Sequence, residues 1–416
     1  MFDTLHSIYP SLYGNAYVET EMDKRFQSLV SSHKALFGSE SPRIFSAAGR
    51  TEIAGNHTDH NLGLVIGGTI NLDTIAAVTP REDTLIHFHS EGFPPCSIDA
   101  SDTEVKEEEV NTTASLLRGI AAAFKEKGIA IKGFDANLTS NVLKGSGLSS
   151  SAAVEVLIAE IFNNLYNEDK FDAVELAKIG QYAENVYFGK PSGLLDQMCC
   201  AYGGIIGIDF KDNKNPVVTP LQVDFSQFEL SMVITDTKGC HADLTQEYAA
   251  VPPEMREIAH FYGKDNCRDV DPKDFFRDIP RIREVVKNDR ALLRAYHFFT
   301  ENMRVRYMLE ELKNDDIDTF LYNVSESGNS SFRFLQNVYP SSAPQEQGLS
   351  LAIAVSESIL QGEGAVRVHG GGFAGTIQAY VPDHLKARYI QEMENLFGEG
   401  CCTIIAIRSI PVGRIY

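Results

Sequence analysis

Basic residues and long apolar runs are scarce in this sequence. It has 37 Lys and Arg against 57 Asp and Glu, which leaves a formal net charge of −20. A nucleic-acid partner would require a basic face, so this charge argues against one. No stretch reaches the ~18 consecutive apolar residues of a membrane span. The first residues show no basic start followed by an apolar run, so no signal peptide is expected. We therefore expect a soluble cytoplasmic protein with no membrane partner.

Cysteine is too sparse and too irregular for a disulfide framework. The cysteines are odd in number, four of them lie in adjacent pairs, and none shows the CxxC or Cys/His spacing of a zinc site. They are Cys96, Cys199, Cys200, Cys240, Cys267, Cys401 and Cys402. Free thiols in a reducing compartment are the expectation.

The rest of the composition is typical of a globular protein with a sizeable core. Hydrophobic residues make up 43% and charged residues 23% of the 416 residues, a length that favours about two to three domains. Strand-like and helix-like segments follow one another without strict alternation, which favours the α+β class with two domains. The polar stretch 211–218, KDNKNPVV, is either a hairpin turn or a seam between domains. We place the two domains at 1–215 and 216–416.

Apolar periodicity and helix-stop signals predict helices at 20–37, 113–126, 150–166, 171–188, 245–262, 290–312, 315–325 and 347–361. Runs rich in apolar and β-branched residues predict strands within 41–50, 64–80, 85–90, 133–143, 202–210, 228–237, 365–381 and 404–416. A glycine turn divides the segment 365–381 into two strands.

The segment 144–156, KGSGLSSSAAVEV, places two glycines and three serines between a predicted strand and a predicted helix. Ser149 or Ser150 is the expected N-cap of that helix. Unpaired backbone N–H groups, the positive end of the helix dipole and several hydroxyls would then point at one spot, which suits a phosphate. The pattern is neither a P-loop nor a dinucleotide-binding fingerprint. A tight turn with an ordinary serine cap is the alternative.

The stretch 47–66, AAGRTEIAGNHTDHNLGLVI, packs polar and charged side chains between two apolar runs, which indicates a binding loop. Its histidines, His57 and His60, could instead be capped or face solvent. Metal ligation through them is a further alternative, but the sequence offers no matching Cys or carboxylate set elsewhere.

Two later stretches are also unusual. The stretch 189–204, GKPSGLLDQMCCAYGG, holds Asp196 in what we expect to be a loop of small residues, where an Asp is usually a turn or cap residue. The stretch 368–376, VHGGGFAGT, has three consecutive glycines that allow a positive φ or a close backbone approach. A simple hairpin turn is the alternative for the glycines.

Taken together and in this order, these segments resemble the galactokinases of the galactokinase, homoserine, mevalonate and phosphomevalonate kinase (GHMP) superfamily. AAGRTEIAGNHTDHNLG is similar to the family's sugar-binding signature, GSGLSSSAA to its phosphate loop and VRVHGGGFAG to its C-terminal glycine motif. LLDQM resembles the segment with the catalytic aspartate, and TDTKGCHADLTQEY the one ending in a sugar-contacting tyrosine. The resemblance implies two α+β domains, with the sugar signature and phosphate loop in 1–215, the glycine motif in 216–416 and the active site in the cleft between them.

The resemblance also implies an activity: an ATP-dependent sugar 1-kinase that uses Mg²⁺ and converts galactose and ATP to galactose 1-phosphate and ADP. Such a transfer needs in-line positioning and neutralised phosphate charge more than covalent help from the protein. By position, Asp196 is the implied general base and Arg50 its partner. The implied sugar contacts are Asn56, His57, Asp59, Gly193 and Tyr248, the implied ATP contacts are Gly145, Ser146, Gly147, Leu148, Ser149, Ser150 and Ser151, and the implied magnesium ligands are Ser151 and Glu184.

The sequence departs from the family pattern at several positions. Glu52 stands where the family usually has Asn, Asn56 where it has Glu, and His60 where it has Tyr. There is no Trp to line the adenine pocket, with Thr113 near that position, and AAVPPEM follows Tyr248 in place of two arginines. Two alternatives therefore stay open: a 1-kinase for a related sugar such as N-acetylgalactosamine or arabinose, and a non-catalytic sensor of galactose and ATP. The oligomeric state is also open, and a monomer is compatible with the sequence.

Overall fold

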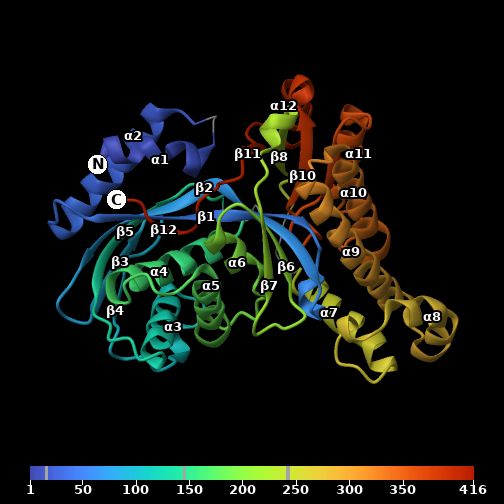
Figure 1. Cartoon of the computed structure of the whole chain (residues 1–416), viewed down its shortest axis with the longest axis horizontal. Helices are drawn as coiled ribbons and strands as arrows, with labels where there is room; N and C mark the ends of the chain where they lie inside the picture. The colour runs from blue at the N-terminus through green and yellow to red at the C-terminus, as the bar shows by residue number, and fades with distance from the viewer. Residues whose placement is uncertain (15–16, 144–146, 240–243) are drawn as a thin grey trace.

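The computed structural model describes residues 1–14, 17–143, 147–239 and 244–416. Within these residues the strands form two sheets, one of eight strands and one of four, and helices cover the faces of both (Figure 1). Nearly all strand pairs are antiparallel, and the helices do not alternate strictly with the strands along the chain. The predicted α+β class is confirmed.

The first sheet is built from both ends of the chain. Its strands are β1 (Arg43–Ala54), β2 (Leu64–Pro80), β3 (Leu85–Ser90), β4 (Cys96–Asp99), β5 (Phe134–Ser140), β6 (Ile205–Asp209), β7 (Val217–Leu221) and β12 (Gly413–Arg414). The order is β12-β1-β2-β5-β3-β4, with β6 paired to β2 and β7 paired to β6. The polar stretch 211–218 is therefore largely a hairpin turn between β6 and β7. The domain boundary at 215/216 stays a prediction. Two strands that follow it in the chain, β7 and β12, belong to the first sheet.

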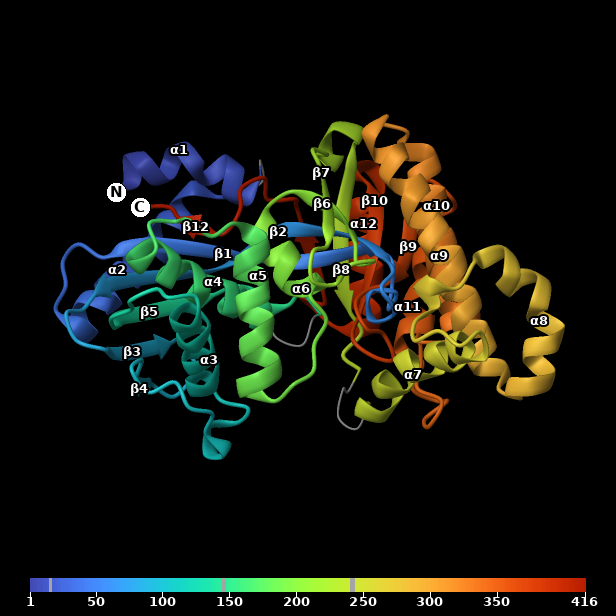
Figure 2. The same ribbon diagram turned by 60° about the horizontal axis from the view of Figure 1, so that its bottom comes forward.

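Helices cover both faces of the first sheet, which explains why β1 is buried along almost its whole length. α1 (Phe2–Tyr13) and α2 (Glu19–Phe37) lie on one face, and α3 (Thr113–Glu126), α4 (Ser150–Tyr166), α5 (Ala173–Tyr182) and α6 (Leu195–Tyr202) lie on the other (Figures 1 and 2). The main apolar core fills the space between the sheet and α3 to α6. The bounds of α3 and α4 are those predicted from the sequence.

The second sheet consists of β8 (Leu230–Asp236), β9 (Ala365–Val368), β10 (Thr376–Pro382) and β11 (Cys402–Ile405), in the order β11-β8-β10-β9. The helices around it are α7 (Thr245–Phe261), α8 (Pro272–Val286), α9 (Asp289–Lys313), α10 (Ile317–Ser330), α11 (Gly348–Leu360) and α12 (Asp383–Phe397). β9 and β10 form the predicted pair of strands joined by a glycine turn. α8 projects at the end of the molecule farthest from the chain termini (Figure 1).

Several predictions from the sequence were wrong in detail. α1, α6, α8 and α12 were not predicted; α1 and α8 contain Pro10 and Pro280, which break the usual helix pattern. The predicted strand at 404–416 is limited to the end of β11 and to β12. The predicted helix 171–188 changes after Tyr182 into η3 (Ala183–Phe188), which has the wider π-helical hydrogen bonding.

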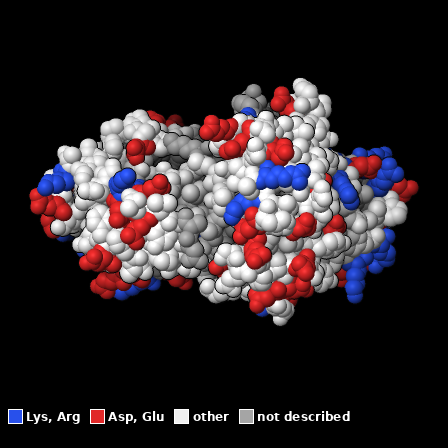
Figure 3. Space-filling model, turned by 90° about the horizontal axis from the view of Figure 1, so that it is seen from above, with Lys and Arg blue, Asp and Glu red and all other residues white. Residues whose placement is uncertain are grey.

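Two observations concern the surface and the thiols. On the face shown in Figure 3, acidic side chains are spread over both halves of the molecule, and basic ones are most frequent toward the end that carries α8. All cysteines in the described ranges are free thiols, as predicted. Among the described residues, we find no helix with the length and hydropathy needed to cross a bilayer.

Candidate active site

The centre of the candidate site is an ion pair between Arg50 of β1 and Asp196 of α6. Arg50 Nε and Nη2 lie 2.8 Å and 2.7 Å from Asp196 Oδ1, and Ser149 Oγ donates to Asp196 Oδ2 over 2.6 Å. Burial raises the pKa of Asp196, but the Arg50 charge and the Ser149 hydrogen bond outweigh it and hold that pKa below its usual range. The carboxylate is therefore ionised at neutral pH, and its side chain is still 41% exposed.

The prediction that Asp196 lies in a loop was wrong, because Asp196 belongs to the first turn of α6. The buried residues Leu195, Met198 and Cys199 have the three-and-four spacing of one helix face, and they pack this short helix against the core. The helix fixes the backbone direction of Asp196. A carboxylate in the first helical turn also faces the positive end of the helix dipole, which favours its charged form.

The phosphate-loop residues are held against β1. Arg50 Nη1 donates to the Gly147 carbonyl, and the Arg50 backbone N–H donates to the Leu148 carbonyl over 3.0 Å. A Cβ on Gly49 would lie 2.5 Å from that Leu148 oxygen, so a glycine is required at this close approach. The loop and the sugar-signature strand thus form one unit. Gly145 and Ser146 lie outside the described residues.

Ser149 occupies the predicted N-cap position of α4, but its side chain does not cap the helix. Its backbone is left-handed, with φ 59° and ψ 49°, whereas a capping serine normally has an extended backbone. The Ser149 hydroxyl bonds to Asp196 instead. Ser150 and Ser151 form the start of the helix, where Ser150 is half-buried and Ser151 is exposed.

Glu184, the second implied magnesium ligand, lies in the π-helical turn η3 and is almost fully buried. Its Oε1 accepts from Lys190 Nζ over 2.7 Å, and its Oε2 accepts from Gln197 Nε2 over 2.9 Å. One carboxylate and one serine hydroxyl form a donor set that fits Mg²⁺, because this ion keeps water and phosphate oxygens as its other ligands. The buried Glu155 Oε1 and Gln197 Oε1 nearby have no hydrogen-bond partner. The residues present therefore fit a magnesium site.

Asn56 follows the end of β1 and has all of its polar side-chain groups paired. Its Nδ2 donates to Glu52 Oε1 over 2.8 Å and to the Gly370 carbonyl over 2.7 Å. Its Oδ1 accepts from Asn337 Nδ2 over 2.6 Å and from Ser331 Oγ over 3.4 Å. The side chain is fully buried. Its role as a sugar contact stays a prediction, since a sugar hydroxyl would have to replace one of these partners.

The glycine turn between β9 and β10 holds two further residues implied in sugar binding. His57 Nε2 lies 2.8 Å from the Gly371 carbonyl, and Tyr248 Oη donates to the Gly372 carbonyl over 2.8 Å. Burial lowers the pKa of His57 to about 4, so the ring is neutral and donates from Nε2. The Gly370 carbonyl accepts from Asn56, so the carbonyls of three consecutive glycines accept one hydrogen bond each from Asn56, His57 and Tyr248. The glycine turn is thus part of the site. The alternative of a simple hairpin turn does not account for these three hydrogen bonds.

Asp59 and Gly193 are in direct contact. A Cβ on Gly193 would lie 2.5 Å from Asp59 Oδ2, so only a glycine lets the chain pass this carboxylate. His60, beside them, is exposed, with its Nε2 3.9 Å from Asp59 Oδ1. In the described part of the chain, His57 and His60 join no group of three metal-type ligands; the group that does occur consists of His6, Glu19 and Asp23 on α1 and α2. The geometry therefore gives no support to a metal site at the two histidines.

The sequence reasoning did not select four residues that now belong to the site. Gln197 and Arg367 lie inside segments that carry the resemblance. Gln197 directly follows Asp196, and Arg367, shortly before the glycine turn, has its Nη2 3.4 Å from Glu52 Oε1. Their place in these segments was a signal that could have found them. Glu155 is one helical turn after Ser151, on the same helix face. Asn337 lies in no motif, and only the fold brings it to Asn56.

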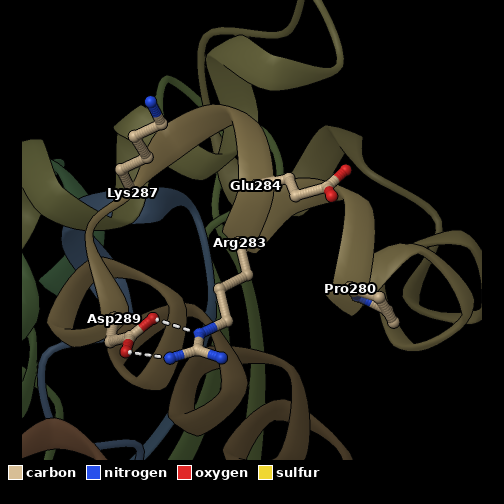
Figure 4. Close-up of a pocket in the computed structure, with 5 residues that line it drawn as sticks. All are labelled: Pro280, Arg283, Glu284, Lys287 and Asp289. Atoms are coloured by element: carbon tan, nitrogen blue, oxygen red, sulfur yellow. Dashed lines mark hydrogen bonds and ion pairs between the residues drawn. The ribbon is translucent and has the colours of Figure 1, made fainter.

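A surface pocket at the end of α8 is separate from this site. It is lined by Pro280, Arg283, Glu284, Lys287 and Asp289. Arg283 pairs with Asp289, while Lys287 and Glu284 point away from that pair (Figure 4). None of the implied site residues lines this pocket.

The comparisons with known proteins agree with this geometry. Residues 115–204 match the GHMP kinases N terminal domain, and residues 31–80 match the galactokinase galactose-binding signature. Among solved structures, Lactococcus lactis galactokinase complexed with galactose superposes with a TM-score of 0.80 at 22% identity, covering 94% of this chain and 99% of that one. Methanococcus jannaschii mevalonate kinase has a TM-score of 0.61 at 14% identity, covering 88% of this chain and 98% of that one. The protein therefore has the GHMP kinase fold.

The curated relatives define the family more narrowly. The galactokinase of Streptomyces coelicolor is 30% identical over 351 residues, which is 82% of this chain and 85% of that protein. The galactokinase of Clostridium tetani is 28% identical over 348 residues, 83% of this chain and 86% of that protein. This chain belongs to the galactokinase family.

Proposed function

We propose that this chain transfers the γ-phosphate of ATP to the anomeric hydroxyl of galactose, giving galactose 1-phosphate and ADP. The observation that carries the proposal is the position of Asp196, which is held between Arg50 of the sugar-signature strand and Ser149 of the phosphate loop. Membership of the galactokinase family supports the same reaction. Because the reaction consumes ATP, we propose that it takes place in the cytoplasm.

In this proposal Asp196 accepts the proton of the attacking hydroxyl. Its lowered pKa makes it a weak base, which is sufficient because phosphoryl transfer passes through a loose transition state in which the proton is lost late. Arg50 keeps the carboxylate charged and fixed in direction. The guanidinium also adds positive charge near the γ-phosphate, where negative charge develops during transfer.

The phosphates are assigned to the start of α4. Backbone N–H groups at a helix N-terminus and the hydroxyls of Ser149, Ser150 and Ser151 neutralise phosphate charge. Gly147 and Leu148 fix the path of this loop through their contacts with Arg50. Mg²⁺, when bound, neutralises and orients the phosphate oxygens. Ser151 and Glu184 are the residues that would hold it.

The sugar is assigned to the other end of the site. His57 donates from Nε2 to the protein, which leaves Nδ1 as an acceptor for a sugar hydroxyl. Asp59 provides a carboxylate acceptor, and Gly193 and Tyr248 complete the contact surface. Asn56 supports these residues through the glycine turn. The exchange of Glu and Asn between positions 52 and 56 is the observation that favours testing related sugars as well.

The experiment is an ADP-release assay with the purified protein, ATP and a panel of galactose, N-acetylgalactosamine, arabinose and glucose, followed by NMR of the product. We expect galactose or a close relative to be phosphorylated at C1. Phosphate on the C6 hydroxyl would contradict the assignment of Asp196 as the group that faces C1. No ADP release with any sugar, together with measurable sugar and ATP binding, would favour the sensor alternative.

A further inference from the structure

Gln197 connects two buried carboxylates beside the candidate magnesium site. The residue directly follows Asp196 on α6, and its side chain is fully buried. Its Nε2 donates to Glu155 Oε2 over 2.9 Å and to Glu184 Oε2 over 2.9 Å. A side-chain amide nitrogen carries two hydrogens. Both are therefore used, and the amide can keep both bonds in one orientation only.

The three residues come from three different elements. Glu155 lies on α4, Glu184 on η3 and Gln197 on α6, and these elements pack together around α5. α5 contributes Gly180 at the closest point. A Cβ at Gly180 would lie 3.3 Å from Glu155 Cβ and 3.4 Å from Gln197 Cγ. The chain thus leaves little free volume around the bridge, which restricts the rotamers of all three side chains.

The bridge has an electrostatic consequence. Without the amide hydrogens, the carboxylates of Glu155 and Glu184 would face each other in a buried place, where an unpaired charge is costly. The remaining partner of Glu184 is Lys190, whose side chain is 57% exposed and long enough to move. Gln197 is therefore the rigid partner of Glu184, and Lys190 is the flexible one.

Resting on the proposed function, we propose that Gln197 is a positioning residue that fixes the Glu184 carboxylate for Mg²⁺ by bridging it to Glu155. Because Gln197 follows Asp196 on the same short helix, the metal ligand is oriented by the helix that carries the general base. The buried Glu155 Oε1 and Gln197 Oε1, which have no hydrogen-bond partner, lie on the same bridge.

The test measures metal binding directly. Mn²⁺ affinity is determined by electron paramagnetic resonance in the presence of a non-hydrolysable ATP analogue, for the wild type and for Gln197→Met, which keeps the length of the side chain and removes both donors. Loss of a partner that orients a metal ligand typically lowers metal affinity by about tenfold to a hundredfold. We expect a loss in this range, a matching rise in the Mg²⁺ concentration for half-maximal ADP release, and an unchanged KM for the sugar.

Gln378→Met is the matched control. Gln378 is also fully buried and also donates to a side chain, Thr51 Oγ1, but it contacts neither carboxylate. It is expected to lose stability without losing Mn²⁺ affinity. Unchanged Mn²⁺ affinity in Gln197→Met, or an equal loss in Gln378→Met, would overturn the proposal, since either result reduces Gln197 to a packing residue.

A second pair of variants applies if Gln197→Met does not fold. Glu155→Gln retains an oxygen that accepts from Gln197, whereas Glu155→Met does not. We expect Mn²⁺ affinity to fall by at least about tenfold in Glu155→Met and to stay within about threefold in Glu155→Gln. Equal affinities in the two variants would also overturn the proposal. A wild type that releases no ADP with any sugar contradicts the proposed function instead, so the two failures are distinguishable.

Discussion

The exchange of an amide and a carboxylate between positions 52 and 56 leads to a prediction about coupled substitution. The family pattern has Asn at the first position and Glu at the second, and this chain has the reverse. In the structure Asn56 Nδ2 donates to Glu52 Oε1 over 2.8 Å. We expect Asn56→Glu alone to be damaging. The double variant with Glu52→Asn should recover most of the loss, because it restores one amide and one carboxylate.

The magnitude follows from the buried contacts. Asn56→Glu places a second carboxylate beside the first and removes the donors to Glu52 and to the Gly370 carbonyl. Arg367 Nη2, 3.4 Å from Glu52 Oε1, neutralises one carboxylate and not two. An uncompensated buried charge costs about 3–5 kcal/mol of unfolding free energy. In the double variant the main loss is the donor to Gly370, about 1–3 kcal/mol. The double variant is therefore expected to be about 2 kcal/mol more stable than Asn56→Glu.

The assay is urea unfolding of the wild type, both single variants and the double variant, followed by kcat/KM for the four sugars of the panel. Coupling should appear as a double variant that is more stable than Asn56→Glu. If Asn56→Glu matches the wild type within about 0.5 kcal/mol, the two side chains are not coupled and the reasoning is refuted. If galactose is already the best substrate by a wide margin and the double variant uses it less well, the exchange does not mark a changed sugar preference.

Two further predictions concern protons. Asp196→Asn should lower kcat by about a hundredfold to ten-thousandfold, because the amide keeps the shape of the side chain and cannot accept the proton. The affinity for an ATP analogue, measured by calorimetry, should stay within about threefold. Near-normal turnover would remove Asp196 from the role of base. Burial raises the pKa of Glu160 on α4 to about 7, so between about pH 4.5 and 7 the folded state binds a proton that the unfolded state has lost, and the unfolding free energy falls through this range and levels off above it. Glu160→Gln should abolish roughly 3 kcal/mol of this pH dependence in urea unfolding between pH 5 and 8; an unchanged slope would contradict a raised Glu160 pKa.

The parts of the fold that could be predicted from sequence are those whose pattern is local. The helix 150–166 has an apolar face and was predicted with its correct bounds. For 211–218 the sequence left a hairpin turn and a domain seam open, and the strand β7 that completes the hairpin was not predicted. α6 was missed because its eight residues, Leu195–Tyr202, are too few to establish a period. α8 was missed because Pro280 interrupts a pattern that tertiary packing of Phe275 and Ile282 nevertheless stabilises.

The candidate site also contains contacts that the sequence could predict and contacts that it could not. The pairing of Arg50 with Asp196 followed from a resemblance carried by continuous motifs, although the two residues are 146 positions apart. The contact of Asn337 with Asn56 spans 281 positions and involves a residue with no motif around it. Hydrogen bonds between side chains from distant elements leave no period in a single sequence. Such hydrogen bonds can be identified only from the folded structure, in which the two sheets lie in fixed positions relative to each other.

The contacts between the two sheets explain how the sugar signature can depart from the family pattern while the phosphate loop keeps it. Arg50 contacts Asp196 and the phosphate loop, all of which belong to the first sheet and its helices. Asn56, six residues later, contacts Gly370 of the turn in the second sheet. A change at position 56 therefore acts on the contact between the sheets and leaves the Arg50 ion pair in place. The chain can thus alter the sugar end without losing phosphoryl-transfer chemistry, provided that one amide and one carboxylate are kept between positions 52 and 56.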